Sequence, residues 1–178
     1  VARICSASES RREGGISVAN FGYSDLWTST QVGVISFSWP LRQRSMTMHD
    51  DEFLRTFLRG WPAEERFGHY EHLRIAWLVI DRHGPELAAA IVGERLRAMA
   101  IAQGKAPLYN ETMTRFWIRL IAHVRDAMGP FLGIDEAIAR APFLTDKNLP
   151  LRHWSRTAMF GPAARVEWIE PDLVPLPF

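Results

Sequence analysis

Glycine and proline divide the chain after Met46 into segments whose apolar residues recur at the three- and four-residue spacing of a helix face. The longest segment runs from Tyr109 to Met128 and ends at Gly129-Pro130, a pair at which helices commonly stop. The connections between segments are short, and no alternation long enough for a strand follows Met46. The sequence therefore predicts an all-α protein, a compact bundle of five or six helices.

The same glycine and proline residues set the expected helix bounds. We expect Asp50 to cap a first helix that Pro62 ends, and Gly84-Pro85 to separate the end of a second helix from the start of a third. The expected helical ranges are 50–61, 64–83, 85–103, 109–128, 134–141 and, less regularly, 151–160. The proline-rich stretch 169–177 cannot be helical. Because it also carries apolar residues, we expect it to be extended and packed on the bundle, with a disordered tail as the alternative.

Residues 1–45 are rich in serine and glycine and have no sustained helical period. We expect an irregular or disordered leader here, followed by a single helical domain over residues 46–178. Because Met46 and Met48 directly precede the first helical pattern, we hypothesise that the folded protein begins near Met46. The leader is then either upstream sequence or a disordered extension.

Charge and cysteine content argue against several classes of protein. Of the 21 basic and 20 acidic residues, five basic and three acidic ones precede Met46, which leaves the helical domain with one net negative charge. A domain without basic excess is a poor candidate for nucleic-acid binding. No stretch is apolar enough for a signal peptide or membrane span. The only cysteine is Cys5, so no disulfide framework is expected, and we predict a cytoplasmic protein.

Two histidines are the most informative local feature. His69 and His72 lie about 60° apart on a helix and share one arc with Leu73, Ala76, Val79, Ile80 and His83, the arc we expect to be buried. Two imidazoles on one face can bind a divalent metal, hold an anion or act as acid and base. The structural alternative is that each imidazole simply hydrogen-bonds the backbone. Glu71 points away from both.

Partners for the histidines could come from the start of the longest helix, where Tyr109, Asn110 and Glu111 are adjacent. Their structural alternative is also good: asparagine is a favoured N-cap, and a glutamate in the first turn suits the helix dipole. Glu111 could equally pair with Arg115 one turn on. Phosphate-loop, dinucleotide, nucleophile-elbow and H-E-x-x-H motifs are absent from the sequence.

Several motifs occur in a set order: His69-x-x-His72-Leu-Arg74-Ile-Ala-Trp-Leu, Tyr109-Asn-Glu-Thr, Asp146-Lys147, and Pro-Asp-Leu-Val-Pro-Leu-Pro over 171–177. With these motifs the chain resembles, over residues 53–177, an uncharacterised family of small, mostly helical bacterial proteins. Members of that family usually carry histidine in place of Asn110. The family brings no activity with it.

The resemblance implies that polar side chains from separate helices converge on one pocket, walled by His69, His72, Arg74, Tyr109, Glu111 and Lys147. Because the amide of Asn110 is a poor metal ligand, a divalent metal would be held by His69, His72 and Glu111 with water in the open position. The leading hypothesis is a protein that binds or acts on a small molecule in this pocket. The alternative is a non-enzymatic helical interaction module in which these residues are structural.

Overall fold

The computed structural model describes residues 48–178, and the predicted leader lies outside them. Within this range the protein contains helices and no strand, as predicted. The α-helices are α1 (Met48–Arg59), α2 (His69–Ala102), α3 (Glu111–Met128), α4 (Ile134–Arg140), α5 (Arg156–Met159) and α6 (Pro162–Val166). Three short 3₁₀ helices join them: η2 (Ala106–Leu108), η3 (Pro142–Thr145) and η4 (Leu149–Arg152).

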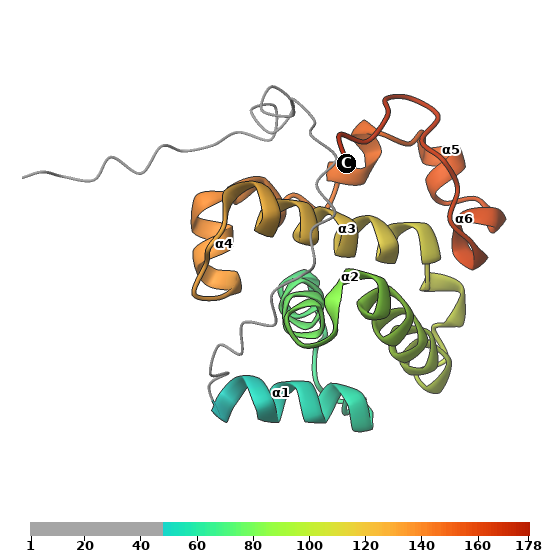
Figure 1. Cartoon of the computed structure of the whole chain (residues 1–178). Coiled ribbons are helices and arrows are strands. Elements are labelled where there is room, and N and C mark those ends of the chain that lie inside the picture. The colour runs from blue at the N-terminus through green and yellow to red at the C-terminus, as the bar shows by residue number, and fades with distance from the viewer. Residues whose placement is uncertain (1–47) are drawn as a thin grey trace, which may run out of the picture.

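Helix α2 lies between α1 on one side and α3 on the other (Figure 1). Because neighbours cover it from more than one side, its first half is buried nearly all round, from Leu73 through Ile75 to Ile80. The single buried arc expected from the sequence was therefore too narrow. The buried arc also ends earlier along the helix than expected, since His83, which was placed on it, is exposed.

As expected, the helix is interrupted at Gly84 and resumes at Pro85, with no loop between the two halves, so that they form one kinked helix, α2. Gly84 has φ 78° and ψ 165°, a backbone conformation that other residues rarely adopt, and Pro85 starts the second half of the helix. The kink turns the second half of α2 to a new direction beside the start of α3 (Figure 1). This change of direction builds the site described below.

The second predicted helix begins at His69 and not near Glu64. The amide of Gly68 donates a hydrogen bond of 2.8 Å to Oε2 of Glu71, the reciprocal half of a capping box, which ends the preceding loop and starts the helix. This role explains why Glu71 does not join the histidines.

The first helix begins at Met48, so Asp50 is not its cap. The carboxylate of Asp50 instead accepts hydrogen bonds of 3.1 and 2.7 Å from Nε and Nη2 of Arg74. A tertiary ion pair between α1 and α2 has replaced the local capping role that the sequence suggested.

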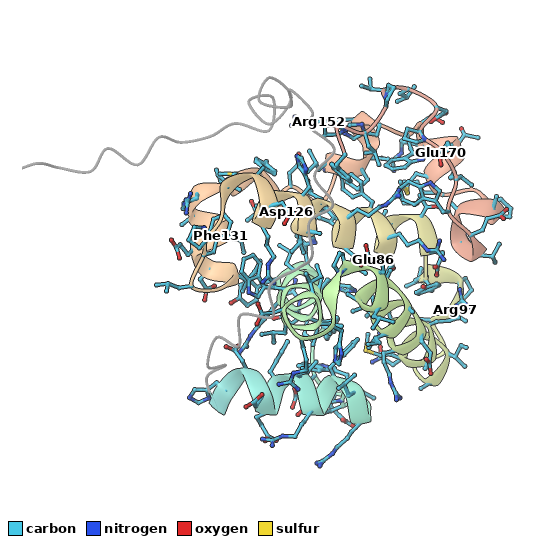
Figure 2. All side chains as sticks on the ribbon, viewed as in Figure 1. Glu86, Arg97, Asp126, Phe131, Arg152 and Glu170 are labelled. Atoms are coloured by element: carbon cyan, nitrogen blue, oxygen red, sulfur yellow. The ribbon has the colours of Figure 1, made fainter. Side chains whose placement is uncertain are left out.

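Helix α3 ends at Met128 as expected but begins at Glu111, two residues after the expected start; it packs on α2 and, through Phe116, on Phe178 at the C-terminus. Side chains fill the spaces between the helices (Figure 2). No helix of residues 48–178 is long and apolar enough to cross a membrane. The largest fully buried side chains are Trp154, Phe116, Leu54, Leu73, Ile75, Ile80, Ile118, Leu120, Ile121, Leu144, Leu149 and Met159.

The C-terminal stretch is free of helix and packs on the bundle, as predicted. The amides of Leu173 and Val174 donate to the carbonyl of His153, and His153 Nδ1 lies 2.8 Å from the carbonyl oxygen of Val174. Trp154 Nε1 donates to the carbonyl of Ile169. The less regular helix expected over 151–160 is instead the end of η4 followed by α5, and α6 was not expected.

Candidate functional site

The start of α3 is fixed by side chains on both sides of Glu111. Asn110 is the N-cap: its Oδ1 accepts from the amide of Met113 at 2.8 Å, and its Nδ2 donates to the carbonyl of Met159. Thr112 Oγ1 donates to the carbonyl of Glu167 at 2.7 Å. The predicted capping role of Asn110 is thus confirmed, and the position of Glu111 is set from two directions.

The carboxylate of Glu111 is almost completely buried, with 7% of the residue exposed, and three side chains donate to it. Oε2 accepts from the Tyr109 hydroxyl at 2.5 Å and from Arg97 Nη2 at 3.2 Å. Oε1 accepts from Arg115 Nε at 2.7 Å. A buried carboxylate needs this degree of pairing, because an unpaired charge in this position would be strongly unfavourable.

Close approach of α2 to this cluster depends on Gly93. A Cβ at this position would lie 3.1 Å from the Tyr109 hydroxyl oxygen and 3.7 Å from Oε2 of Glu111. The Tyr109 ring is covered by the guanidinium of Arg97, whose Cζ is 4.9 Å from the ring centre. Burial, and to a smaller extent the hydrogen bond to Glu111, raises the pKa of Tyr109 to about 12, so its hydroxyl remains a donor at neutral pH.

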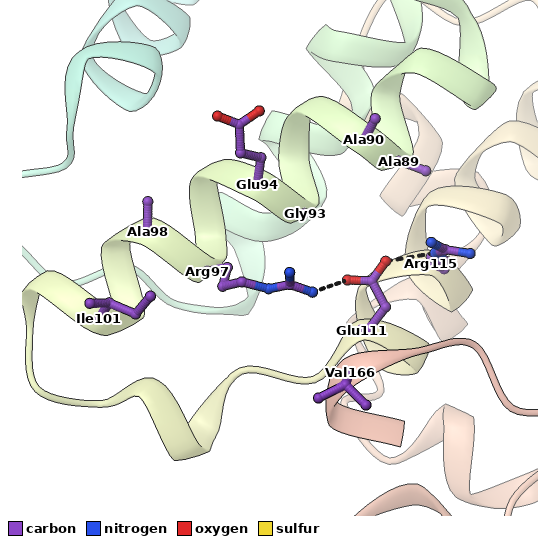
Figure 3. A pocket seen from close by; sticks show the side chains of 10 residues that line it. All are labelled: Ala89, Ala90, Gly93, Glu94, Arg97, Ala98, Ile101, Glu111, Arg115 and Val166. Atoms are coloured by element: carbon purple, nitrogen blue, oxygen red, sulfur yellow. Dashed lines mark hydrogen bonds and ion pairs between the residues drawn. The ribbon is translucent and has the colours of Figure 1, made fainter. Parts of the chain in front are cut away.

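This cluster forms one side of an open pocket of about 530 Å³. Figure 3 shows Glu111 between the guanidinium group of Arg97, which comes from the second half of α2, and that of Arg115, which comes from α3. The volume lies in the range usual for small-molecule sites. The lining residues are Ala89, Ala90, Gly93, Glu94, Arg97, Ala98, Ile101, Glu111, Arg115 and Val166.

Chemically, the pocket offers positively charged hydrogen-bond donors. Glu111 is bonded by one nitrogen of each guanidinium group, Nη2 of Arg97 and Nε of Arg115. About half of each arginine side chain is exposed, 51% for Arg97 and 47% for Arg115. The remaining N–H groups of both arginines are therefore open to water and to a ligand that accepts hydrogen bonds.

The histidine pair lies at the other end of α2, away from this pocket. His69 Nε2 is 2.8 Å from the carbonyl oxygen of Leu144, and His72 Nδ1 is 2.6 Å from that of Gly68. A carbonyl oxygen only accepts, so each of these ring nitrogens carries a proton. Burial lowers the pKa of both histidines. These contacts match the structural alternative, in which each imidazole satisfies the backbone.

The tentative metal set of His69, His72 and Glu111 is not assembled. Neither histidine lines the pocket that Glu111 lines, and residues 48–178 contain no group of three or more His, Cys, Asp or Glu side chains placed to hold a metal ion. Each of the three side chains is instead held by a different partner: His69 by the Leu144 carbonyl, His72 by the Gly68 carbonyl and Glu111 by Arg115.

The other predicted pocket residues are divided between the two ends of α2. Tyr109 donates a hydrogen bond to Glu111 but does not itself line the pocket. Arg74 pairs with Asp50 and lies over the ring of Phe53, with Cζ 4.2 Å from the ring centre. Lys147 is exposed, and its charge helps to lower the pKa of His69, after the larger effect of burial. The single pocket expected from the resemblance is thus two separate regions.

Sequence reasoning missed Arg97 and Gly93. The signal for Gly93 was the run of small residues Ala89-x-x-x-Gly93, whose spacing lets another element approach one face of a helix. Nothing local marks Arg97, because its partner is fourteen residues away on another helix. Arg115 was recognised as a helical partner of Glu111, and that ion pair is confirmed.

No protein-family model matches this chain, and neither the curated proteins nor the solved structures contain a significant match.

Proposed function

We propose that this protein binds a small anionic molecule in the pocket between the second half of α2 and the start of α3. The observation that carries the proposal is the pair of half-exposed guanidinium groups, those of Arg97 and Arg115, held on either side of buried Glu111. The proposal keeps the small-molecule hypothesis drawn from the sequence, but it places the binding site at the arginines around Glu111 and not at the histidines.

Preorganisation supports this proposal. Glu111 and the Tyr109 ring restrain Arg97, while Glu111 restrains Arg115 through Nε. A ligand therefore meets donors whose conformational freedom is already reduced, which lowers the entropic cost of binding. Two arginines and one glutamate leave one positive charge in the cluster, so an anion adds charge-assisted hydrogen bonds without displacing Glu111.

Binding is favoured over catalysis by what the cluster lacks. The proposed catalytic role of a histidine as general base requires an imidazole within hydrogen-bond reach of the ligand. No histidine is among the residues that line the pocket. Tyr109, with its pKa of about 12, is a poor base at neutral pH. The pair of guanidinium groups is suited to holding an anion.

The test is isothermal titration calorimetry of the full chain with acetate, butyrate and inorganic phosphate at low ionic strength. Replacing Arg115 with Gln should lower the affinity for the bound anion about 10-fold or more, the usual value of a charge-assisted hydrogen bond. The matched control is Arg95→Gln, an exposed arginine on α2 that does not line the pocket. Equal affinities for Arg95→Gln and Arg115→Gln, or no binding of any anion by the wild type, would refute the proposal.

A helical interaction module is the second candidate function. Its supporting observation is the group of large apolar side chains exposed beside η2 and α6: Ile101, Leu108 and Val166. This candidate predicts that small anions do not bind and that Leu108→Ser, outside the pocket lining, weakens association with a protein partner. The calorimetric experiment therefore separates the two candidates.

A further inference from the structure

We infer that the anion is a monocarboxylate with an unbranched aliphatic chain, its carboxylate at Arg97 and Arg115 and its chain along Ile101 and Val166. This inference rests on the proposed function and adds the ligand class to it.

Apolar side chains at the rim of the pocket argue for an apolar part of the ligand. Ile101 is 61% exposed and Val166 is 69% exposed, and both line the pocket that the two arginines line. Ile101 is one helical turn beyond Arg97, so a chain that starts at the guanidinium group passes the isoleucine next. A purely ionic ligand would leave both side chains in water, whereas an aliphatic chain would cover them.

Small residues make up part of the α2 side of the pocket. Ala89, Ala90, Gly93 and Ala98 of α2 line the pocket beside the arginines (Figure 3). They contribute no hydrogen-bonding side chain and no bulk. At these four positions the pocket accommodates methylene groups and offers no side-chain hydrogen bond to a hydroxylated or amide-rich chain.

Charge favours one negative charge on the ligand over two. The lining contains two arginines and two glutamates, Glu111 and Glu94, so its formal charge is balanced. Figure 3 shows the Glu94 carboxylate directed away from the Arg97–Glu111–Arg115 cluster, which leaves the cluster itself with one excess positive charge. A carboxylate matches that charge and the planar guanidinium group, whereas a phosphate dianion would place a second negative charge near Glu111.

The experiment compares acetate, butyrate, hexanoate and octanoate by calorimetry with the full chain, all below their micelle-forming concentrations. Each methylene that becomes buried should raise the affinity about three- to fourfold. Ile101→Ser and Val166→Ser should reduce this chain-length dependence. Both side chains are exposed, so neither change should affect folding. Leu87→Ser is the matched control, because Leu87 is 59% exposed on α2 and does not line the pocket.

Failures of the inference and of the proposed function are distinguishable. If the acids bind with Arg115-dependent affinity but without chain-length dependence, the ligand class is wrong and the anion site stands. Hexanol binding as tightly as hexanoate, or phosphate binding more tightly than hexanoate, would also overturn the ligand class. Binding by none of the acids and none of the inorganic anions would overturn the proposed function itself.

Discussion

The contact between Gly93 and Tyr109 gives a prediction whose sign depends on the background in which it is measured. Gly93 lies inside α2, where replacement by alanine normally stabilises a helix by about 1 kcal/mol. Here the new Cβ would lie 3.1 Å from the Tyr109 hydroxyl oxygen, so the hydroxyl must shift by a few tenths of an ångström. That hydroxyl donates the 2.5 Å hydrogen bond to Glu111.

The two effects have different sizes. A hydrogen bond to a charged acceptor contributes about 1.5–3 kcal/mol, so its distortion outweighs the gain in helix propensity. We expect Gly93→Ala to destabilise the wild-type protein by about 1 kcal/mol. In the Tyr109→Phe background the hydroxyl is absent, and the same substitution should stabilise the protein by about 0.5–1 kcal/mol.

Urea unfolding of the wild type, both single variants and the double variant measures this coupling as a double-mutant cycle. The predicted coupling energy is about 1.5–2 kcal/mol. If Gly93→Ala changes the free energy of unfolding by the same amount in both backgrounds, the close approach of α2 to Tyr109 and Glu111 is wrong, and with it the geometry of the pocket.

Three further predictions concern the rest of the fold. Burial lowers the folded-state pKa of His69 and His72 below the ordinary histidine value of about 6.5, so the unfolded chain binds protons first; the free energy of unfolding should be maximal above about pH 6.5 and fall below it. In urea unfolding at several pH values, His72→Gln should flatten this dependence and the exposed His83→Gln should not; an unchanged slope in His72→Gln would refute the assignment. Asp81 and Arg125 form a largely buried ion pair, with 19% and 14% of their side chains exposed. Chemical denaturation should show Asp81→Asn destabilising the protein by about 1–3 kcal/mol and Glu52→Gln, in an exposed pair, by less than about 0.5; equal effects would contradict this ranking. Trp154→Phe removes the hydrogen bond to the carbonyl of Ile169 and should cost about 1–3 kcal/mol in the same assay, whereas wild-type stability would show that the C-terminal stretch is not docked there.

The all-helical class and helix α3 were predictable because they depend on local signals. The apolar spacing of α3, its Asn110 cap and its ending at Gly129 are all contained in consecutive residues. The Gly68 and Glu71 box that starts α2 was equally local, but with glycine in place of serine or threonine it does not match the usual capping-box signature. Gly84-Pro85 was correctly identified as an interruption, whereas its outcome as a kink depends on the neighbours packed against both halves of α2.

The candidate site was only half predictable. The pairing of Glu111 with Arg115 follows from helical spacing, and it is present. The contribution of Arg97 depends on the direction of the second half of α2 after the kink, which sequence spacing does not specify. The same dependence explains the error about the histidines: His69 and Glu111 were grouped by residue type, while the folded chain places them in separate regions.

The most direct test of the proposed binding site is a ¹⁵N-edited NMR titration of the full chain with hexanoate. We expect saturable shifts of backbone amides that cluster along residues 89–101, at 111–115 and near Val166, the segments that line the pocket. Arg115→Gln should weaken these shifts, and Arg95→Gln should leave them unchanged. Shifts centred on His69 and His72, or no saturable shifts at all, would contradict it.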